Sequence, residues 1–194
     1  MSKRQREKSL QTKRELMKSA VRLFGEKGFV ATTVQEIAYR AGYAKGNFYR
    51  YWRSKDDIFL DIMENRLKEY REKRKEGLEK AKDVSEVMSV IVDFLETILD
   101  DKDWSRVFLE FTIYSFGKEE VKKKLNNSNY RLSTDLFAEI LQPFYQDTES
   151  AKKLGALITA LFEGFLIQKA LNSKVIDKGD LREAILILSR HFLK

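Results

Sequence analysis

The sequence predicts an all-α protein, and three observations support this fold class. The chain of 194 residues contains one proline and nine glycines, so few positions interrupt regular structure. Apolar residues recur every three or four positions, which is the spacing of amphipathic helices and not of strands. Hydrophobic residues make up 43% of the chain, enough for a packed core. We expect a three-helix domain over residues 1–53, a larger helical domain over residues 54–194, and about nine helices in all.

The first predicted helix covers Gln11 to Lys27 and has a clear end. Its inward face carries apolar residues at helical spacing, namely Leu16, Ala20, Leu23 and Phe24. Gly28 follows at a position suited to positive φ, and Phe29 is placed to pack back on the last turn.

Two short helices around a tight turn follow. Thr33 as N-cap and Glu36 three residues later form a capping box for the first of them. This helix ends in an Ala-Gly pair, and only four positions separate Arg40 from Lys45, where the next helix begins. Two short helices so closely joined are typical of a helix-turn-helix.

The helix that begins at Lys45 presents a polar, basic and aromatic face. At about 100° per residue, its bulky side chains cluster on the inward side, namely Phe48, Tyr51 and Trp52. The outward residues are Gly46, Asn47, Tyr49, Arg50 and Arg53, with Lys45 at the flank. Arg50 and Asn47 have the chemistry to bind guanine and adenine edges; the alternative for both is contact with the DNA backbone alone.

Positive charge is concentrated in this part of the chain. Residues 1–53 carry 13 Lys and Arg against 4 Glu, a net charge of +9, whereas the remainder has a net charge of −2. Such asymmetry is expected of a segment that faces phosphate groups. Lys3, Arg4 and Arg6 precede the first predicted helix, either as a solvated tail or as an arm that enters a minor groove.

A long helix follows the helix-turn-helix. Ser54 is a suitable N-cap, and Asp56 and Asp57 in the first turn are favourable at the positive end of the helix dipole. We expect this helix to run to about Lys82 and to span both domains.

One stretch, from Leu23 to Phe59, resembles the DNA-binding domain of TetR-type repressors. It reads LFGEKGFVATTVQEIAYRAGYAKGNFYRYWRSKDDIF. The shared features are an aromatic before a Lys-Gly helix end, a Thr-Thr pair, Ile-Ala followed by Ala-Gly, a Lys-Gly, a Tyr and an aromatic, and Ser-Lys-acid-acid. Two positions depart from the pattern: Ala44 replaces a capping Ser, and Trp52 replaces a Phe.

The resemblance implies that Thr33, Tyr49 and Lys55 contact DNA phosphates. Together with the outward face of the third helix, this gives the predicted DNA-binding residues: Thr33, Lys45, Gly46, Asn47, Tyr49, Arg50 and Lys55. The expected partner is double-stranded DNA with a near-palindromic operator, bound by a homodimer that places two copies of the third helix in successive major grooves.

Periodicity predicts the remaining helices. They cover Val84–Asp100, Asp103–Phe116, a stretch from Tyr130 towards Pro143, Glu149–Leu171 and Leu181–Phe192. In the TetR family the final pair forms a four-helix bundle with a twofold mate. Small residues one turn apart make a shallow face, so we predict a dimer interface at Ala156, Ala160, Gly164, Ile185 and Leu188. The alternative is that these helices form a core within one chain.

The aromatic residues of the larger domain suggest a binding cavity. Family members enclose an effector there, and we predict its lining to be Trp104, Phe108, Phe111, Tyr114, Phe137, Phe162 and Phe165. Simple core packing is the alternative. Glu110 and Glu163 lie in apolar surroundings, so each is expected to find a donor in the protein, face solvent or meet an effector.

The predicted function is transcriptional repression, relieved by a small, largely apolar effector. A ligand-independent DNA-architectural protein with a filled core is the alternative. A small enzyme with Glu110 or Glu163 as general base is a third hypothesis, disfavoured because the chain has no cysteine and one histidine. We therefore expect no catalytic residues, no metal and no cofactor. Because no apolar run has the length of a signal peptide or membrane span, we expect a cytoplasmic protein with no membrane partner.

Overall fold

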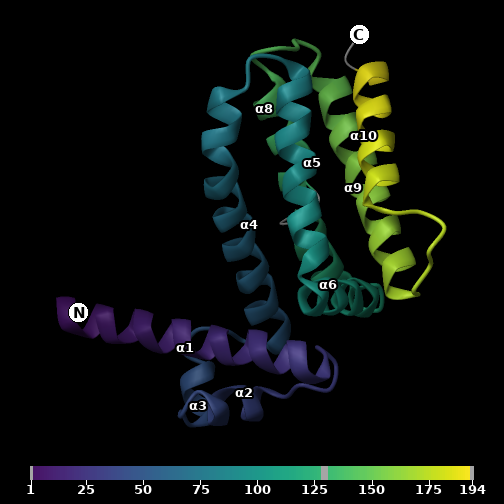
Figure 1. Cartoon of the computed structure of the whole chain (residues 1–194). Helices are drawn as coiled ribbons and strands as arrows, with labels where there is room; N and C mark the ends of the chain where they lie inside the picture. The colour runs from purple at the N-terminus through teal and green to yellow at the C-terminus, as the bar shows by residue number, and fades with distance from the viewer. Residues whose placement is uncertain (1, 128–130, 193–194) are drawn as a thin grey trace.

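The computed structural model describes residues 2–127 and 131–192. Within these ranges the chain forms ten α-helices and no strand, which confirms the all-α prediction (Figure 1). The first three helices form a lower layer, and the last six form an upper part above it. The fourth helix connects the two parts.

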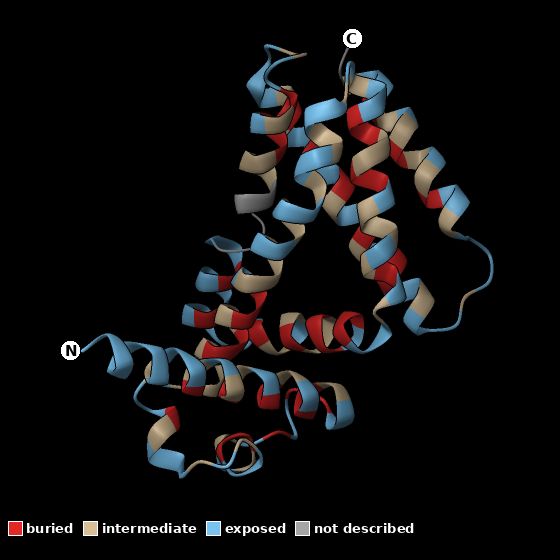
Figure 2. Ribbon diagram, turned by 60° about the vertical axis from the view of Figure 1, so that its left-hand side comes forward, coloured by how far each residue is buried: buried red, intermediate tan, exposed pale blue. Residues whose placement is uncertain are grey.

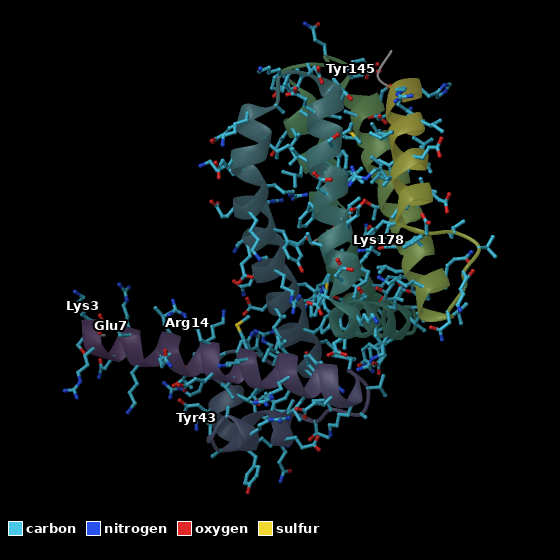
Figure 3. The ribbon with its side chains drawn as sticks, in the orientation of Figure 1. Lys3, Glu7, Arg14, Tyr43, Tyr145 and Lys178 are labelled. Atoms are coloured by element: carbon cyan, nitrogen blue, oxygen red, sulfur yellow. The ribbon has the colours of Figure 1, made fainter. Side chains whose placement is uncertain are left out.

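The lower layer contains α1 (Lys3–Lys27), α2 (Val34–Arg40) and α3 (Lys45–Phe48). Helix α1 begins earlier than predicted, because Ser2 and Gln5 form a capping box in which each side chain binds the other's backbone N–H. The prediction that the first residues form a disordered tail was therefore wrong. They form the exposed start of α1, which extends beyond the rest of the domain; Lys3 and Glu7 mark it in Figure 3.

The expected local signals hold α2 and α3 in place. Thr33 and Glu36 form the predicted capping box. The inward side chains are buried as expected, among them Leu16, Ala20, Ile37, Ala38, Phe48 and Trp52. Ser19 on α1 donates a hydrogen bond of 2.8 Å to the carbonyl of Ile37, which joins α1 to the end of α2.

Helix α4 (Lys55–Lys80) belongs to both parts of the molecule. Its first turns bury Ile58, Phe59 and Ile62 in the core that α1 completes, and its remainder rises beside α5 (Figure 1). Ser54 caps it, as predicted, by accepting from the N–H of Asp57 at 3.1 Å. Helix α4 is therefore a continuous connection between the two parts.

The upper part is a helical bundle with one helix lying across its base. Its members are α5 (Val84–Asp100), α6 (Lys102–Ser115), α7 (Glu119–Leu125), α8 (Arg131–Leu141), α9 (Thr148–Ala170) and α10 (Lys178–Phe192). Helix α8 packs along α9, while α10 packs on α9 and α5. Helix α6 lies across the base and contacts α1 (Figure 1). Buried positions gather where the helices face one another (Figure 2).

None of the helices in the described ranges is long and apolar enough to cross a membrane.

Candidate functional site

The outer surface of α3 carries the residues that were predicted to bind DNA. Lys45, Gly46, Tyr49 and Arg50 are exposed, and Asn47 is half-buried. Tyr49 is 50% exposed with the ammonium of Lys45 near its ring, 5.9 Å from the centroid. The structure therefore brings five of the seven predicted residues together on one surface, which we call the α3 surface.

Sequence reasoning missed Tyr39 on the neighbouring helix α2. Its side chain is 83% exposed, more than any other aromatic of the helix-turn-helix among the described residues. An aromatic side chain this exposed contributes little to packing within its own chain. The available signal was its position opposite the buried pair Ile37 and Ala38 on a short amphipathic helix.

Gly46 has no role within the chain that requires a glycine. Its φ is not positive, and a Cβ placed there meets no other atom within 4 Å. A helical glycine costs about 1 kcal/mol relative to alanine. A glycine with open space around it allows a close approach by the backbone of another molecule.

Thr33 is exposed at the start of α2, and its hydroxyl is already hydrogen-bonded. It donates to Glu36 Oε2 at 2.7 Å and accepts from the N–H of Glu36 at 3.3 Å. Hydrogen bonds from Lys27 and then from Thr33 lower the pKa of Glu36 to about 2. The capping role of Thr33 is confirmed, and its phosphate contact stays a prediction.

Lys55 has a different role from the one predicted. Its Nζ donates to the carbonyls of Phe29, Val30 and Thr32, at 2.6, 3.0 and 2.7 Å. Burial lowers the pKa of this ammonium. An ammonium has three hydrogens to donate, and all three are used inside the chain. Lys55 therefore positions the loop of residues 28–33, which precedes α2, and has no hydrogen left for a phosphate.

Glu110 of α6 holds the same loop from the other side. Its two carboxylate oxygens accept from the N–H groups of Phe29 at 2.8 Å and Val30 at 2.9 Å. Of the three outcomes considered for this carboxylate, the structure gives the first, a donor within the protein. The 28–33 loop is thus held between Lys55 on its carbonyls and Glu110 on its amides.

Gly28 makes this contact sterically possible. Its φ is +86°, as expected from the sequence, in a region that residues with a side chain rarely adopt. A Cβ at this position would lie 2.6 Å from Glu110 Oε2. Both the backbone conformation and the close carboxylate therefore require glycine here.

Two residues predicted to line the cavity lie instead at the junction between the two parts. Phe111 stacks on Phe59 of α4 with 4.0 Å between ring centroids, and its edge contact with Phe29 spans 4.9 Å. Tyr114 packs on Phe29 and donates to Asp56 at 3.1 Å. The prediction for Phe111 and Tyr114 was wrong because helical periodicity does not distinguish which neighbour a buried face meets.

A cavity of about 140 Å³ lies between α4, α5, α6, α8 and α9. Four of the predicted residues line it, namely Trp104, Phe108, Phe137 and Phe162. Phe165 is buried but is not among the lining residues, so this prediction was also wrong. Glu163 of α9 lines the cavity as well.

Sequence reasoning missed the contribution of α4 and α5 to this cavity. The missed residues are Met63, Arg66, Leu67, Tyr70, Arg71, Arg74, Ile91, Phe94, Leu95 and Ile98. A signal was present in the four-residue spacing of Arg66, Tyr70 and Arg74, which puts them on one face of α4. The charged residues around them made this helix look solvent-exposed.

The sequence of the helix-turn-helix matches a known family. Residues 16–62 match the model described as bacterial regulatory proteins, tetR family. This range covers the C-terminal part of α1, the α3 surface and the first turns of α4. Residues 16–62 therefore form a TetR-family domain. It contains a helix-turn-helix of the DNA-binding type.

Comparison with individual proteins agrees with this assignment. The chain is 46% identical over 52 residues to YerO of Bacillus subtilis, described as an uncharacterized HTH-type transcriptional regulator, and the match covers 27% of this chain and 18% of YerO. The chain spans 18% and 62% of the lengths of the first two curated relatives that it matches.

Solved structures share the fold over nearly the whole chain. One is FadR of Thermus thermophilus, a TetR-family transcriptional repressor in complex with lauroyl-CoA, with a TM-score of 0.67, 22% identity, and 93% of each chain covered. Another, from Saccharomonospora viridis, is described as a transcriptional regulator in complex with choline; its TM-score is 0.70, at 19% identity and with 93% of this chain and 96% of that chain covered. At these identities the likeness establishes the fold alone.

Most residues of the predicted dimer face are exposed in the single chain. Ala156, Ala160 and Gly164 lie on the outer side of α9, and a Cβ at Gly164 would meet no atom within 4 Å. Leu188 of α10 is half-buried. Ile185 is 0% exposed, so it belongs to the core of its own chain and must be removed from the predicted interface.

Proposed function

We propose that this TetR-family regulator is a repressor. It binds a near-palindromic operator as a homodimer and releases it when a small, largely apolar effector occupies the cavity between α4 and α9. Residues 1–53 form the DNA-binding domain in this proposal, and residues 54–194 form the effector-binding and dimerisation domain.

The observation that carries the proposal is that two helices bind the 28–33 loop through side-chain hydrogen bonds. Lys55 of α4 donates to its carbonyls, and Glu110 of α6 accepts from its amides. The same two helices line the cavity, through Arg66 and Tyr70 on α4 and Trp104 on α6. A shift of either helix therefore changes the position of the loop that leads into α2.

The cavity is too small for a long effector unless these helices shift. A dry cavity of about 150 Å³ accommodates a ligand the size of benzene. The cavity here has about the same volume, 140 Å³. A longer effector must therefore move the lining helices apart. It binds the conformer with separated helices more tightly than the closed one, and this difference in affinity sets how far the equilibrium between them shifts.

The α3 surface is proposed to enter the major groove. Lys45 and Tyr49 contact phosphates, Asn47 and Arg50 bind base edges, and Gly46 permits close approach of the DNA backbone. Thr33 remains a proposed phosphate contact that exchanges its bond to Glu36 for one to phosphate. We assign Lys55 to loop positioning, for the reason given above.

Dimerisation is proposed to use the outer face of α9 with α10. Large apolar side chains are exposed there, among them Leu157, Leu161 and Ile187. An apolar surface of this kind marks an interface. Ala156, Ala160 and Gly164 lie beside them and allow a second helix to approach closely.

The experiment is a selection of genomic fragments by the purified protein, repeated in the presence of candidate lipophiles. We expect enrichment of a near-palindromic site and loss of binding when an effector is present. Direct binding of each lipophile is followed in parallel by calorimetry. A ligand that binds the protein while the operator complex persists would favour the alternative, a ligand-independent DNA-architectural protein.

A further inference from the structure

Three arginines of α4 line the cavity, and one of them is neutralised. Arg66 forms an ion pair with Asp101 at 2.9 Å, and its guanidinium stacks 4.1 Å from the ring centroid of Trp104. These contacts account for the charge of Arg66 within the protein. Arg71 and Arg74 lie further along the same helix and also line the cavity.

Arg71 and Arg74 have no such partner. The Nε of Arg71 is buried and lacks a hydrogen-bond partner. Arg74 donates its Nε to the carbonyl of Tyr70 at 3.2 Å and lies 4.0 Å from the ring centroid of Phe94. No ion pair joins a carboxylate to either arginine in the part of the chain that the structure describes. The two cations therefore stand together in an apolar cavity.

This arrangement is unfavourable in the absence of another group. Burial, and to a lesser extent the neighbouring charge of Arg71, together lower the pKa of Arg74 to about 10. A buried polar group without a partner costs free energy, and a buried charge costs more. An anion placed between the two guanidinium groups supplies the missing hydrogen bonds and cancels their mutual repulsion.

We propose that Arg71 and Arg74 bind the anionic head group of an amphiphilic effector whose apolar tail fills the rest of the cavity. This inference rests on the proposed function and names the chemical class of its effector. The tail is received by apolar side chains from three helices, including Ile91, Leu95, Phe108 and Phe162. The shared chemistry is a carboxylate or phosphate on a long apolar chain.

The charge of the cavity selects against a cationic ligand. Among its described lining residues, Glu163 has the one carboxylate, whereas Arg71 and Arg74 bring two positive charges in addition to Arg66, which Asp101 neutralises. A quaternary ammonium placed near Arg71 and Arg74 meets like charges in a medium of low dielectric constant. The anionic class is therefore favoured over the choline type of ligand, although proteins of this fold are known with both acyl-CoA and choline.

The test compares probes that share one apolar tail and differ in head group. The purified full-length protein is titrated by calorimetry with dodecanoate, dodecyl phosphate, dodecanol and dodecyltrimethylammonium, all below their micellar concentrations. We expect at least one of the two anions to bind about tenfold to a hundredfold more tightly than the alcohol. The cation should bind most weakly. Which anion binds better distinguishes a carboxylate from a phosphate head.

Variants connect the preference to the two arginines. Arg71→Gln with Arg74→Gln should reduce the affinity for the anion to that for dodecanol and leave the affinity for dodecanol unchanged. Lys75→Gln is the matched control, because it removes one positive charge from an exposed position of the same helix. The double variant should be at least as stable to heat as the wild type, since it removes unpaired buried charges.

Two results would overturn the proposal. One is that neither anion binds the wild-type protein more tightly than dodecanol does. The other is that the folded double variant keeps its preference for the anion. The titration contains no DNA, so a failure of the proposed repressor function, seen as an absence of operator binding or release, is distinguished from a failure of head-group recognition.

Discussion

The contact between Glu110 and the 28–33 loop gives the sharpest test of how the two parts of this protein are coupled. Glu110→Ala removes both hydrogen bonds to the amides of Phe29 and Val30. Glu110→Gln is more conservative in shape, but it brings an amide N–H towards one of the two backbone N–H donors. We expect both variants to loosen the loop and to weaken coupling between the cavity and the α3 surface.

The magnitude follows from the geometry of these two bonds. A hydrogen bond to a charged group contributes about 1.5–3 kcal/mol to stability, and the bond to Val30 is partly open to solvent. We expect Glu110→Ala to lower the free energy of unfolding by about 2 kcal/mol, since both bonds are lost and solvent replaces them in part. For a protein of this size that corresponds to a fall in Tm of about 4–8 °C.

Gly28→Ala disturbs the same contact by changing the loop instead of the carboxylate. The new Cβ would lie 2.6 Å from Glu110 Oε2, and a φ of +86° is unfavourable for alanine. Strained backbone of this kind costs about 1–3 kcal/mol. Its destabilisation should therefore equal or exceed that of Glu110→Ala, and the two losses should not add in the double variant, because both act on one contact.

Two assays check this reasoning. Thermal unfolding followed by circular dichroism gives the stability loss, with Glu120→Gln on the exposed side of α7 as the control. Operator affinity measured with and without effector gives the coupling factor, which should fall towards one in the Glu110 variants. A Glu110→Ala protein with wild-type Tm and wild-type coupling would show that the contact neither stabilises the loop nor transmits the effector signal.

Four further substitutions test the DNA-binding residues and the dimer. Lys55→Ala should lower stability by about 1–2 kcal/mol, because three carbonyls lose their donor, and should leave the salt dependence of operator binding unchanged. Lys45→Ala should do the reverse and reduce the slope of log affinity against log salt by about one; a similar slope change for Lys55→Ala would restore its phosphate contact. Arg50→Ala should weaken operator binding by about 1–3 kcal/mol with a much smaller effect on nonspecific DNA, and equal losses on both would make Arg50 a backbone contact. Ala160→Arg should yield a folded monomer that no longer binds operator, because the residue is exposed in the single chain; sedimentation and circular dichroism check this, and a dimeric variant that still binds operator would exclude α9 from the interface.

Much of the helix-turn-helix could be predicted from sequence because its signals are local. A capping box depends on two residues three positions apart, so Thr33 and Glu36 identify the start of α2 without reference to any distant residue. The same holds for Ser54 at α4 and for the positive φ of Gly28. The start of α1 was missed although Ser2 and Gln5 form an equivalent box, because the helix there lacks the apolar period on which the prediction depended.

The site in the upper part depended on contacts between distant residues. Periodicity correctly predicted that Phe111, Tyr114 and Phe165 face other helices, but not whether those neighbours enclose a cavity or fill the space. It led to no prediction for Arg71 and Arg74. Only the tertiary structure places them at a cavity that residues of α5, α6, α8 and α9 also line.

The sequence alone therefore determined most of the helices, though not α7 or the start of α1. It also determined the caps of α2 and α4 and the basic, outward-facing α3 surface, because hydrogen bonds within a few residues and the 3.6-residue period specify them. The tertiary structure decided which charged groups meet. It turned Lys55 from a phosphate contact into a support for the 28–33 loop, and it turned Glu110 from a candidate effector contact into the second support. Residues 81 positions apart along the chain form this contact, and no local pattern encodes a pairing across that distance.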